Sequence, residues 1–260
     1  MPFAKQQADA SSENLFSKVP AITLVFWIVK ILCTTLGETG GDAVTMSMNL
    51  GYLVGTAIFA AIFVVAVASQ VIAKRFHPFL YWTTIIATTT VGTTMADFAD
   101  RSLGLGYAGG SLILLVLLLS SLGVWYWSLG SISVNTVSTP KVEMFYWVTI
   151  MFSQTLGTAL GDWTADSAGL GYGGAAVIFG SLLVLVAACH FWTKISKTVL
   201  FWVAFILTRP LGAVVGDFLD KPLEHGGLNL SRYSASATLV VLVIACILIF
   251  PQRAGQHPKR

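Results

Sequence analysis

Long apolar runs alternate with short polar connections along the whole chain after about residue 20. The apolar runs cover approximately 20–38, 51–73, 79–96, 108–130, 143–160, 172–193, 198–216 and 233–250. Several of them reach the roughly 20 residues that a helix needs to cross a bilayer. The pattern therefore predicts an all-α polytopic membrane protein, with eight transmembrane helices in a single membrane domain over residues 19–251.

The connections between these runs alternate in charge. Cations follow every second run, at Lys74, Arg75, Lys141, Lys194 and Lys197, and the chain ends in Lys259-Arg260. Carboxylates occupy the other connections, at Asp42, Asp97, Asp100, Asp162, Asp166, Asp217, Asp220 and Glu224. The positive-inside rule then predicts cytoplasmic termini, with flexible tails over residues 1–18 and 252–260, although Lys221 and Arg232 in the last outer connection weaken the contrast there.

The composition supports a membrane protein and excludes several functions. Hydrophobic residues make up 55% of the chain and charged residues only 10%, against about 25% charged in a soluble domain. Because the cations lie in the connections, the lipid bilayer is the expected partner and nucleic acid is not, while a homo-oligomer is compatible with the sequence. Catalytic triads, HExxH and nucleotide loops are missing, so neither an enzyme nor a cofactor is expected.

The acidic connections belong to a four-fold internal repeat. Asp42, Asp97, Asp162 and Asp217 are spaced by 55, 65 and 55 residues. A tryptophan lies 15 residues before each aspartate, at Trp27, Trp82, Trp147 and Trp202, and a glycine nine residues after it, at Gly51, Gly106, Gly171 and Gly226. The sequence thus predicts four tandem, parallel helical hairpins over about 20–75, 76–138, 139–195 and 196–251, arranged as two pairs.

Small residues precede each of these aspartates, which we call the framed aspartates. The glycines lie five residues and, in three repeats, one residue before them: Gly37, Gly41, Gly92, Gly157, Gly161, Gly212 and Gly216. Such small-xxx-small pairs allow helices to pack closely in lipid. The first helix of each hairpin is therefore expected inside the bundle, and the leucine- and valine-rich second helix against lipid.

Close packing of the inner helices would bring the framed aspartates together. Carboxylates at helix C-termini require positive charge, and hard oxygen ligands suit manganese or magnesium. The expected metal ligands are Glu38, Asp42, Asp97, Asp162 and Asp217, and the expected pathway residues are Thr34, Thr35, Thr89, Thr90, Gln154 and Thr155. Two structural alternatives stay open. The aspartates cap short outer helices, and the second acids Asp100, Asp166 and Asp220 are exposed or pair with Arg101, Lys221 or Arg232.

Three ionisable residues depart from the repeat and mark a candidate gate. Glu38 stands where the other copies have Thr93, Thr158 and Ala213, and Arg209 takes a threonine-type position. Ionisable residues at membrane depth usually belong to a pathway or relay. We expect Arg209 to pair with Glu38, or with the aspartates, when no cation is bound. Lys30 is either a further charge partner or extends to the cytoplasmic interface.

The repeated Thr-x-Gly-[Glu/Thr]-x-x-[Gly/Ala]-Asp motif, followed by Leu-Gly-Tyr in three copies, resembles a bacterial family of uncharacterised membrane-anchored multi-pass proteins. The resemblance covers nearly the whole chain after residue 20. It implies a bacterial inner-membrane protein, with metal homeostasis, and manganese export first, as the expected role. The fourth copy departs from the motif at Pro210, which replaces threonine, and at Gly227, which replaces tyrosine.

Three functions are compatible with these observations. The first is a divalent-cation transporter, expected to be an exporter of manganese, that works by rocking of its two halves. The second is a proton-coupled transporter of a small organic solute, in which the acids carry protons. The third is a membrane scaffold or sensor subunit without transport activity.

Overall fold

The computed structural model describes residues 16–256. Over these residues the chain forms eight long helices: α2 (Leu24–Asp42), α3 (Gly51–Ile72), α4 (Pro78–Asp97), α5 (Tyr107–Leu129), α6 (Pro140–Asp162), α7 (Gly171–Trp192), α8 (Lys197–Asp220) and α9 (Arg232–Ile249). The shorter elements are β1 (Phe16–Pro20), η1 (Ala43–Ser47), η2 (Phe98–Ser102), η3 (Val134–Thr136), η4 (Trp163–Ser167), η5 (Leu223–His225) and β2 (Ala254–Gln256). The predicted all-helical fold with eight helices is confirmed.

Local sequence explains where the helices begin. Pro78 and Pro140 occupy the first turns of α4 and α6, where a missing N–H costs nothing and the fixed φ favours the helix. The four glycines that follow the framed aspartates by nine residues all have positive φ, between 63° and 80°. These four positions therefore need glycine, because other residues rarely adopt that conformation.

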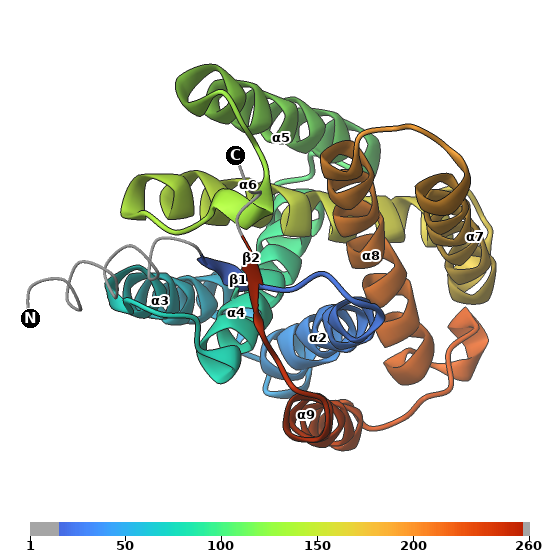
Figure 1. Cartoon of the computed structure of the whole chain (residues 1–260). Coiled ribbons are helices and arrows are strands. Elements are labelled where there is room, and N and C mark those ends of the chain that lie inside the picture. Colours follow the sequence, from blue (N-terminus) through green and yellow to red (C-terminus); the bar gives the residue numbers. More distant parts are fainter. Residues whose placement is uncertain (1–15, 257–260) are drawn as a thin grey trace, which may run out of the picture.

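The helices are arranged as an inner ring surrounded by an outer layer (Figure 1). The inner helices α2, α4, α6 and α8 contact one another in that order, and α8 closes the ring on α2. Each outer helix packs mainly against the inner helix of the next hairpin: α3 on α4, α5 on α6, α7 on α8, and α9 on α2. The hairpins therefore interlock, and none is a separate packing unit.

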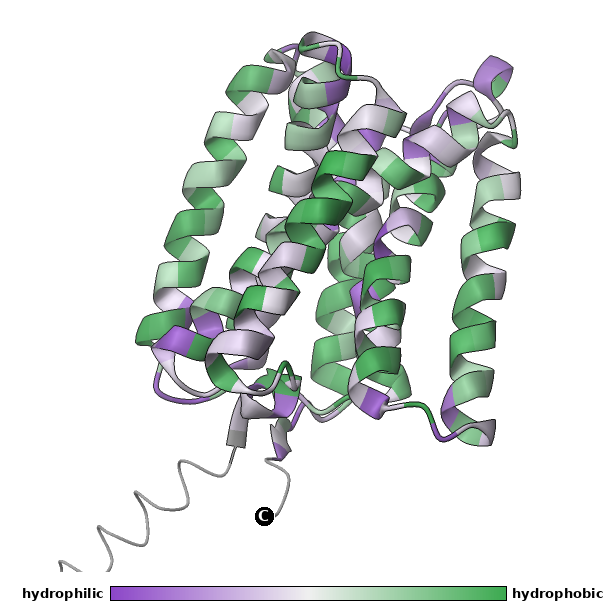
Figure 2. Cartoon of the chain, turned by 90° about the horizontal axis from the view of Figure 1, so that it is seen from above, coloured by the Kyte–Doolittle hydropathy of each residue, from purple (hydrophilic) through white to green (hydrophobic). Residues whose placement is uncertain are grey.

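Six of the helices within residues 16–256 are long and apolar enough to span a membrane: Leu24–Ser47, which joins α2 to η1, and α3, α5, α7, α8 and α9. Helices α4 and α6 are of similar length but rich in threonine and other polar residues, which face their protein neighbours. The outer helices expose leucine, isoleucine and valine along their lengths. Hydrophobic residues accordingly dominate the helices in Figure 2, and hydrophilic residues gather at their ends.

A small sheet ties the two ends of the described chain together at one end of the bundle, here called the strand end. Strand β1 pairs antiparallel with β2, with Phe16 opposite Gln256. Lys18 is buried and its ammonium lies 2.6 Å from Glu143 of α6. The prediction of flexible tails over residues 1–18 and 252–260 therefore extends too far, because residues 16–18 belong to β1 and residues 254–256 form β2. Residues 1–15 and 257–260 lie outside the described part of the chain.

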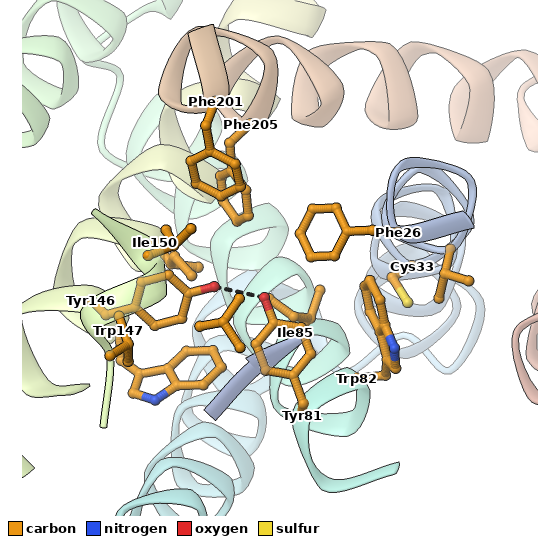
Figure 3. Packing of buried hydrophobic residues seen from close by; sticks show 14 of the residues in the cluster. Phe26, Cys33, Tyr81, Trp82, Ile85, Tyr146, Trp147, Ile150, Phe201 and Phe205 are labelled. Carbon is orange, nitrogen blue, oxygen red and sulfur yellow. Dashed lines mark hydrogen bonds between the residues drawn. The ribbon is translucent and has the colours of Figure 1, made fainter. Parts of the chain in front are cut away.

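Aromatic side chains fill the ring near the strand end (Figure 3). The residues 16 positions before the framed aspartates are all aromatic and buried, at Phe26, Tyr81, Tyr146 and Phe201. The hydroxyls of Tyr81 and Tyr146 form a 2.6 Å hydrogen bond between the neighbouring helices α4 and α6. Trp82, Trp147 and Trp202 are buried in the same cluster. These tryptophans are therefore packing residues, and the ring is closed by aromatic contacts at this level.

Candidate functional site

Equivalent residues at intervals of four form layers inside the ring, because residues i and i+4 share one face of a helix. Counting back from the framed aspartates, we define four layers by their members. The aspartate layer is Asp42, Asp97, Asp162 and Asp217; the Glu38 layer is Glu38, Thr93, Thr158 and Ala213; the Arg209 layer is Thr34, Thr89, Gln154 and Arg209; the Lys30 layer is Lys30, Ile85, Ile150 and Phe205. All sixteen side chains are buried.

The glycines five residues before the framed aspartates hold the Arg209 layer in place. A Cβ at Gly37 would meet Thr89, at Gly92 it would meet Gln154, at Gly157 Arg209, and at Gly212 Thr34. On each inner helix, this glycine is thus packed against one residue of the Arg209 layer from the next inner helix. The pattern closes from α8 back to α2. The predicted role of these glycines in close helix packing is confirmed by these contacts.

Two basic residues bridge the four framed aspartates in pairs. The Lys221 ammonium contacts Asp42 and lies 3.0 Å from Asp217. Arg101 lies 3.0 Å from Asp97 through Nε and 3.7 Å from Asp162 through Nη2. Lys221 and Arg101 each follow a framed aspartate by four residues, one helical turn, whereas Met46 and Asp166 occupy that position in the other two repeats. The layer therefore has the two-fold character expected from the repeat spacing.

A fifth carboxylate joins this layer. Oxygen atoms of Asp42, Asp217 and Asp220 lie within 4.8 Å of one another. Arg232 lies 2.9 Å from Asp220 and 3.8 Å from Asp42 through Nε. One oxygen of Asp42 and one of Asp220 are buried without a hydrogen-bond partner among the described residues. These oxygens form a set of hard ligands that suits a divalent cation.

Lys221 remains charged inside this cluster. Burial by itself lowers the pKa of its ammonium, but the neighbouring Asp217, Asp42 and Asp220 outweigh that effect and hold the pKa well above its ordinary value. The Lys221 ammonium therefore lies between these carboxylates as a permanent internal cation. A metal ion that binds Asp42 and Asp217 has to displace it.

One layer deeper, Arg209 of α8 pairs with Glu38 of the adjacent helix α2, as expected. Arg209 Nη2 lies 2.9 Å from Glu38 Oε2 and 2.5 Å from the hydroxyl of Thr93, and it also contacts the hydroxyl of Thr158. The Thr93 hydroxyl is 3.3 Å from the same Glu38 oxygen. One atom of the guanidinium thus connects all four inner helices, because α4 and α6 supply the two threonines. This pair is the central polar contact of the ring.

Lys30 lies inside the bundle, so its extension to an interface is not what the structure shows. Its side chain is fully buried, and Nζ lies 3.8 Å from the centre of the Phe205 ring. Such a contact places an ammonium over the negative face of an aromatic ring.

The six expected pathway residues fall into two groups. The hydroxyls of Thr35, Thr90 and Thr155 donate to carbonyls one turn earlier in their own helices, at 2.8–3.0 Å. Thr34 likewise bonds to Ile31 and also reaches across to the carbonyl of Thr208 on α8. Only Thr89 and Gln154 keep polar atoms without a partner among the described residues, so these two are the stronger candidates.

The alternative in which the framed aspartates cap short outer helices is not supported. After Asp42, Asp97 and Asp162 the helix continues into the π-helical turns η1, η2 and η4, and these aspartates make no side-chain capping hydrogen bond. In the fourth repeat, α8 continues as far as Asp220. π-Helical turns often mark functional sites, and here they follow the aspartate layer directly.

The second acids behave differently from one another. Asp220 pairs with Arg232, as expected, and Asp166 is exposed. Arg101 and Lys221, however, bind the framed aspartates, so they are site residues that the sequence assigned to the wrong acids. Their position one turn after an aspartate was the available signal, since residues four apart lie side by side on a helix.

Comparison with known proteins agrees with the repeat. A family model described as Repeat of Unknown Function (DUF347) matches residues 25–76, 80–131, 145–196 and 200–253. The starts of these matches are 55, 65 and 55 residues apart, the same spacing as the framed aspartates. Neither a curated protein nor a solved structure matches the chain. Because the four matches cover most of its length, the chain belongs to the DUF347 repeat family.

Proposed function

We propose that the protein is a membrane transporter of a divalent cation and that the ion binds in the aspartate layer. The observation that carries the proposal is the convergence of Asp42, Asp217 and Asp220 oxygens within 4.8 Å. Carboxylate oxygens are the ligands preferred by manganese, magnesium and calcium. Manganese is the first candidate, following the resemblance drawn from the repeat motif.

The charge balance of the layer favours a doubly charged ion. Five buried or largely buried carboxylates, the four framed aspartates and Asp220, face three cations, Arg101, Lys221 and Arg232. Five negative charges less three positive charges leave two negative charges. A divalent cation would neutralise these two negative charges while all three basic residues stay charged. Lys221 would have to move aside from Asp42 and Asp217.

The proposed mechanism uses the two halves of the ring. Lys221 and Arg101 each bridge one pair of framed aspartates, and the aromatic cluster closes the ring toward the strand end. Rocking of one half against the other would open either end in turn. We place this bundle in a bacterial inner membrane with the strand end cytoplasmic, because the loops at that end carry Lys74, Lys141 and Lys194.

Reconstituted vesicles provide the test. Purified protein in liposomes should move Mn²⁺ across the bilayer, measured with a metal-sensitive dye inside the vesicles. Asp42→Asn and Asp217→Asn should each lower the rate at least about tenfold, since each removes a charged ligand. The matched control is Asp166→Asn, because Asp166 is an exposed acid in an equivalent turn. If wild type moves none of Mn²⁺, Mg²⁺, Ca²⁺ or Zn²⁺ above empty vesicles, the proposal fails.

A second candidate function is supported by the Glu38–Arg209 pair. A carboxylate buried below the aspartate layer and held by an arginine is suited to exchange a proton during transport of an organic solute. In that case solute-dependent proton flux would occur without metal, and Glu38→Gln would abolish it while Mn²⁺ had no effect. A scaffold protein would show neither flux, and the aspartate variants would change assembly alone.

A further inference from the structure

Buried polar atoms without a hydrogen-bond partner accumulate just below the Glu38–Arg209 pair, and hydrogen-bond donors outnumber acceptors among them. Among the described residues, the Nζ atom of Lys30, the Nε and Nη1 atoms of Arg209 and both the nitrogen and the oxygen of the Gln154 amide have no hydrogen-bond partner. The hydroxyls of Thr89 and Ser153 are unpartnered as well, and each of the five residues is fully buried. Buried polar groups are nearly always paired, so a group this rich in donors requires an acceptor.

Basic side chains outnumber acidic ones in the same region. It holds Lys30 and Arg209 but one carboxylate, Glu38, which pairs with Arg209 Nη2. Protonation of Lys30 would therefore add a positive charge without a carboxylate partner, deep in the ring. An unpaired ion in this environment is costly, and the Phe205 ring beside Lys30 compensates it only in part.

Four of the five donor residues share one position along the ring, in the adjacent Arg209 and Lys30 layers. Arg209 turns Nη2 toward Glu38, Thr93 and Thr158, which leaves Nε and Nη1 for another partner. Thr89 and Gln154 lie one helical turn before those two threonines, in the same layer as Arg209 itself. Lys30 belongs to the next layer toward the strand end, and its charge and that of Arg209 repel each other.

We propose that this position is a binding site for one small monovalent anion, a halide or a small carboxylate such as formate. An anion supplies only acceptors, and its single charge would neutralise a protonated Lys30. Its size is limited because Thr89, Gln154 and Arg209 are packed against glycines of neighbouring helices. The site is separate from the aspartate layer, and the proposal is independent of which cation or solute that layer binds.

Thermal unfolding of the purified protein in detergent tests the site directly. Sodium gluconate serves as the reference salt, because gluconate is too large for the packed ring, and chloride or formate replaces it at constant ionic strength. Saturation with a fitting anion should raise the Tm of the wild type by about 5 °C or more at a hundredfold excess over Kd. A response to chloride alone identifies a halide site, a response to formate alone identifies a carboxylate site, and a response to both identifies an unselective site.

Variants of the proposed site test whether the dependence of Tm on the anion arises there. Lys30→Met should abolish the dependence of Tm on the anion, whereas Lys194→Met, which removes an exposed lysine, should keep it. Gln154→Leu retains the charges and should raise the apparent Kd at least about threefold, so the test does not depend on folding of the Lys30 variant. The proposal is overturned if the wild type shows no anion dependence, or if Lys30→Met and Gln154→Leu both keep the full wild-type response.

Discussion

Arg209 of α8 binds Glu38 of the neighbouring helix α2 inside the ring, although 171 residues separate them in the chain. Neither residue has a charged counterpart in the other repeats, so the pair breaks the pseudo-four-fold symmetry at its centre. It also joins the last inner helix to the first. The contact therefore both closes the ring and places an ion pair in its interior.

Removal of one partner of the Glu38–Arg209 pair should lower the stability of the folded protein. Glu38→Gln leaves Arg209 and Lys30 without a carboxylate, and loss of one member of a buried pair typically costs about 3–5 kcal/mol. Unfolding in detergent should show a lower midpoint for Glu38→Gln, and addition of Arg209→Met should restore part of the loss. The control is Glu224→Gln, which changes an exposed acid. Equal midpoints for Glu38→Gln and Glu224→Gln would contradict the assigned role of the pair.

The glycine contacts predict a contrast between two alanine substitutions. Gly157→Ala would force a methyl group against the Cβ and Cγ atoms of Arg209, whereas a Cβ at Gly180 in α7 meets nothing within 4 Å. We expect Gly157→Ala to lower the unfolding midpoint and to disturb the Arg209 layer, since overpacking costs about 1–3 kcal/mol. Gly180→Ala should leave stability unchanged or raise it by up to about 1 kcal/mol. The opposite order of the two midpoints would show that the ring tolerates wider spacing.

Lys221 should act as a competitor of the metal. Lys221→Met removes the internal cation from Asp42 and Asp217, so Mn²⁺ should bind more tightly to the variant than to the wild type. Without metal the variant should unfold at a lower temperature, because buried carboxylates lose their partner. Calorimetric titration with Mn²⁺ measures the affinity, and Lys194→Met is the control. Weaker Mn²⁺ binding by Lys221→Met would mean that Lys221 does not occupy the cation position.

The strand end should depend on Lys18. Its ammonium lies 2.6 Å from Glu143 and 3.2 Å from the carbonyls of Gln70 and Val71 at the end of α3. Lys18→Met therefore removes an ion pair and uncovers those carbonyls. Hydrogen exchange of the amides in β1 should become faster by at least about tenfold, whereas Lys141→Met, at an exposed position of α6, should leave it unchanged. Equal protection in both variants would show that the strand pairing alone holds this end.

The repeat made the helices and the inner position of the first helix of each hairpin predictable. A fixed frame of aspartates and glycines specifies which residues are equivalent, and equivalent residues form layers. The pairing of Glu38 with Arg209 followed from the same frame, because both residues depart from it at neighbouring depths. What the sequence did not contain is the partner of each outer helix. Apolar faces such as those of α3 and α9 fit more than one neighbour, so the packing on the next hairpin had to come from the structure.

The details of polar contacts were less predictable for a related reason. Thr35 and Thr34 are adjacent in the chain, yet Thr35 bonds only to its own helix and Thr34 also crosses to α8. Sequence alone does not distinguish a hydroxyl that bonds to its own helix from one that faces a neighbour. Arg101 and Lys221 each had two acids within reach, one and four residues earlier in the chain. Which acid each one binds depended on whether the helix ends in a π-helical turn or continues.

The outer layer has a consequence for biosynthesis. Among the eight described helices, α2, which carries Lys30, Glu38 and Asp42, is synthesised first, but the outer helix that covers it, α9, is synthesised last. Until α9 is inserted, α2 and its three charged residues lack their outer neighbour. Insertion of α9 is therefore the step that covers this side of α2, and chains that stop before α9 would leave α2 for the cell's quality control to recognise.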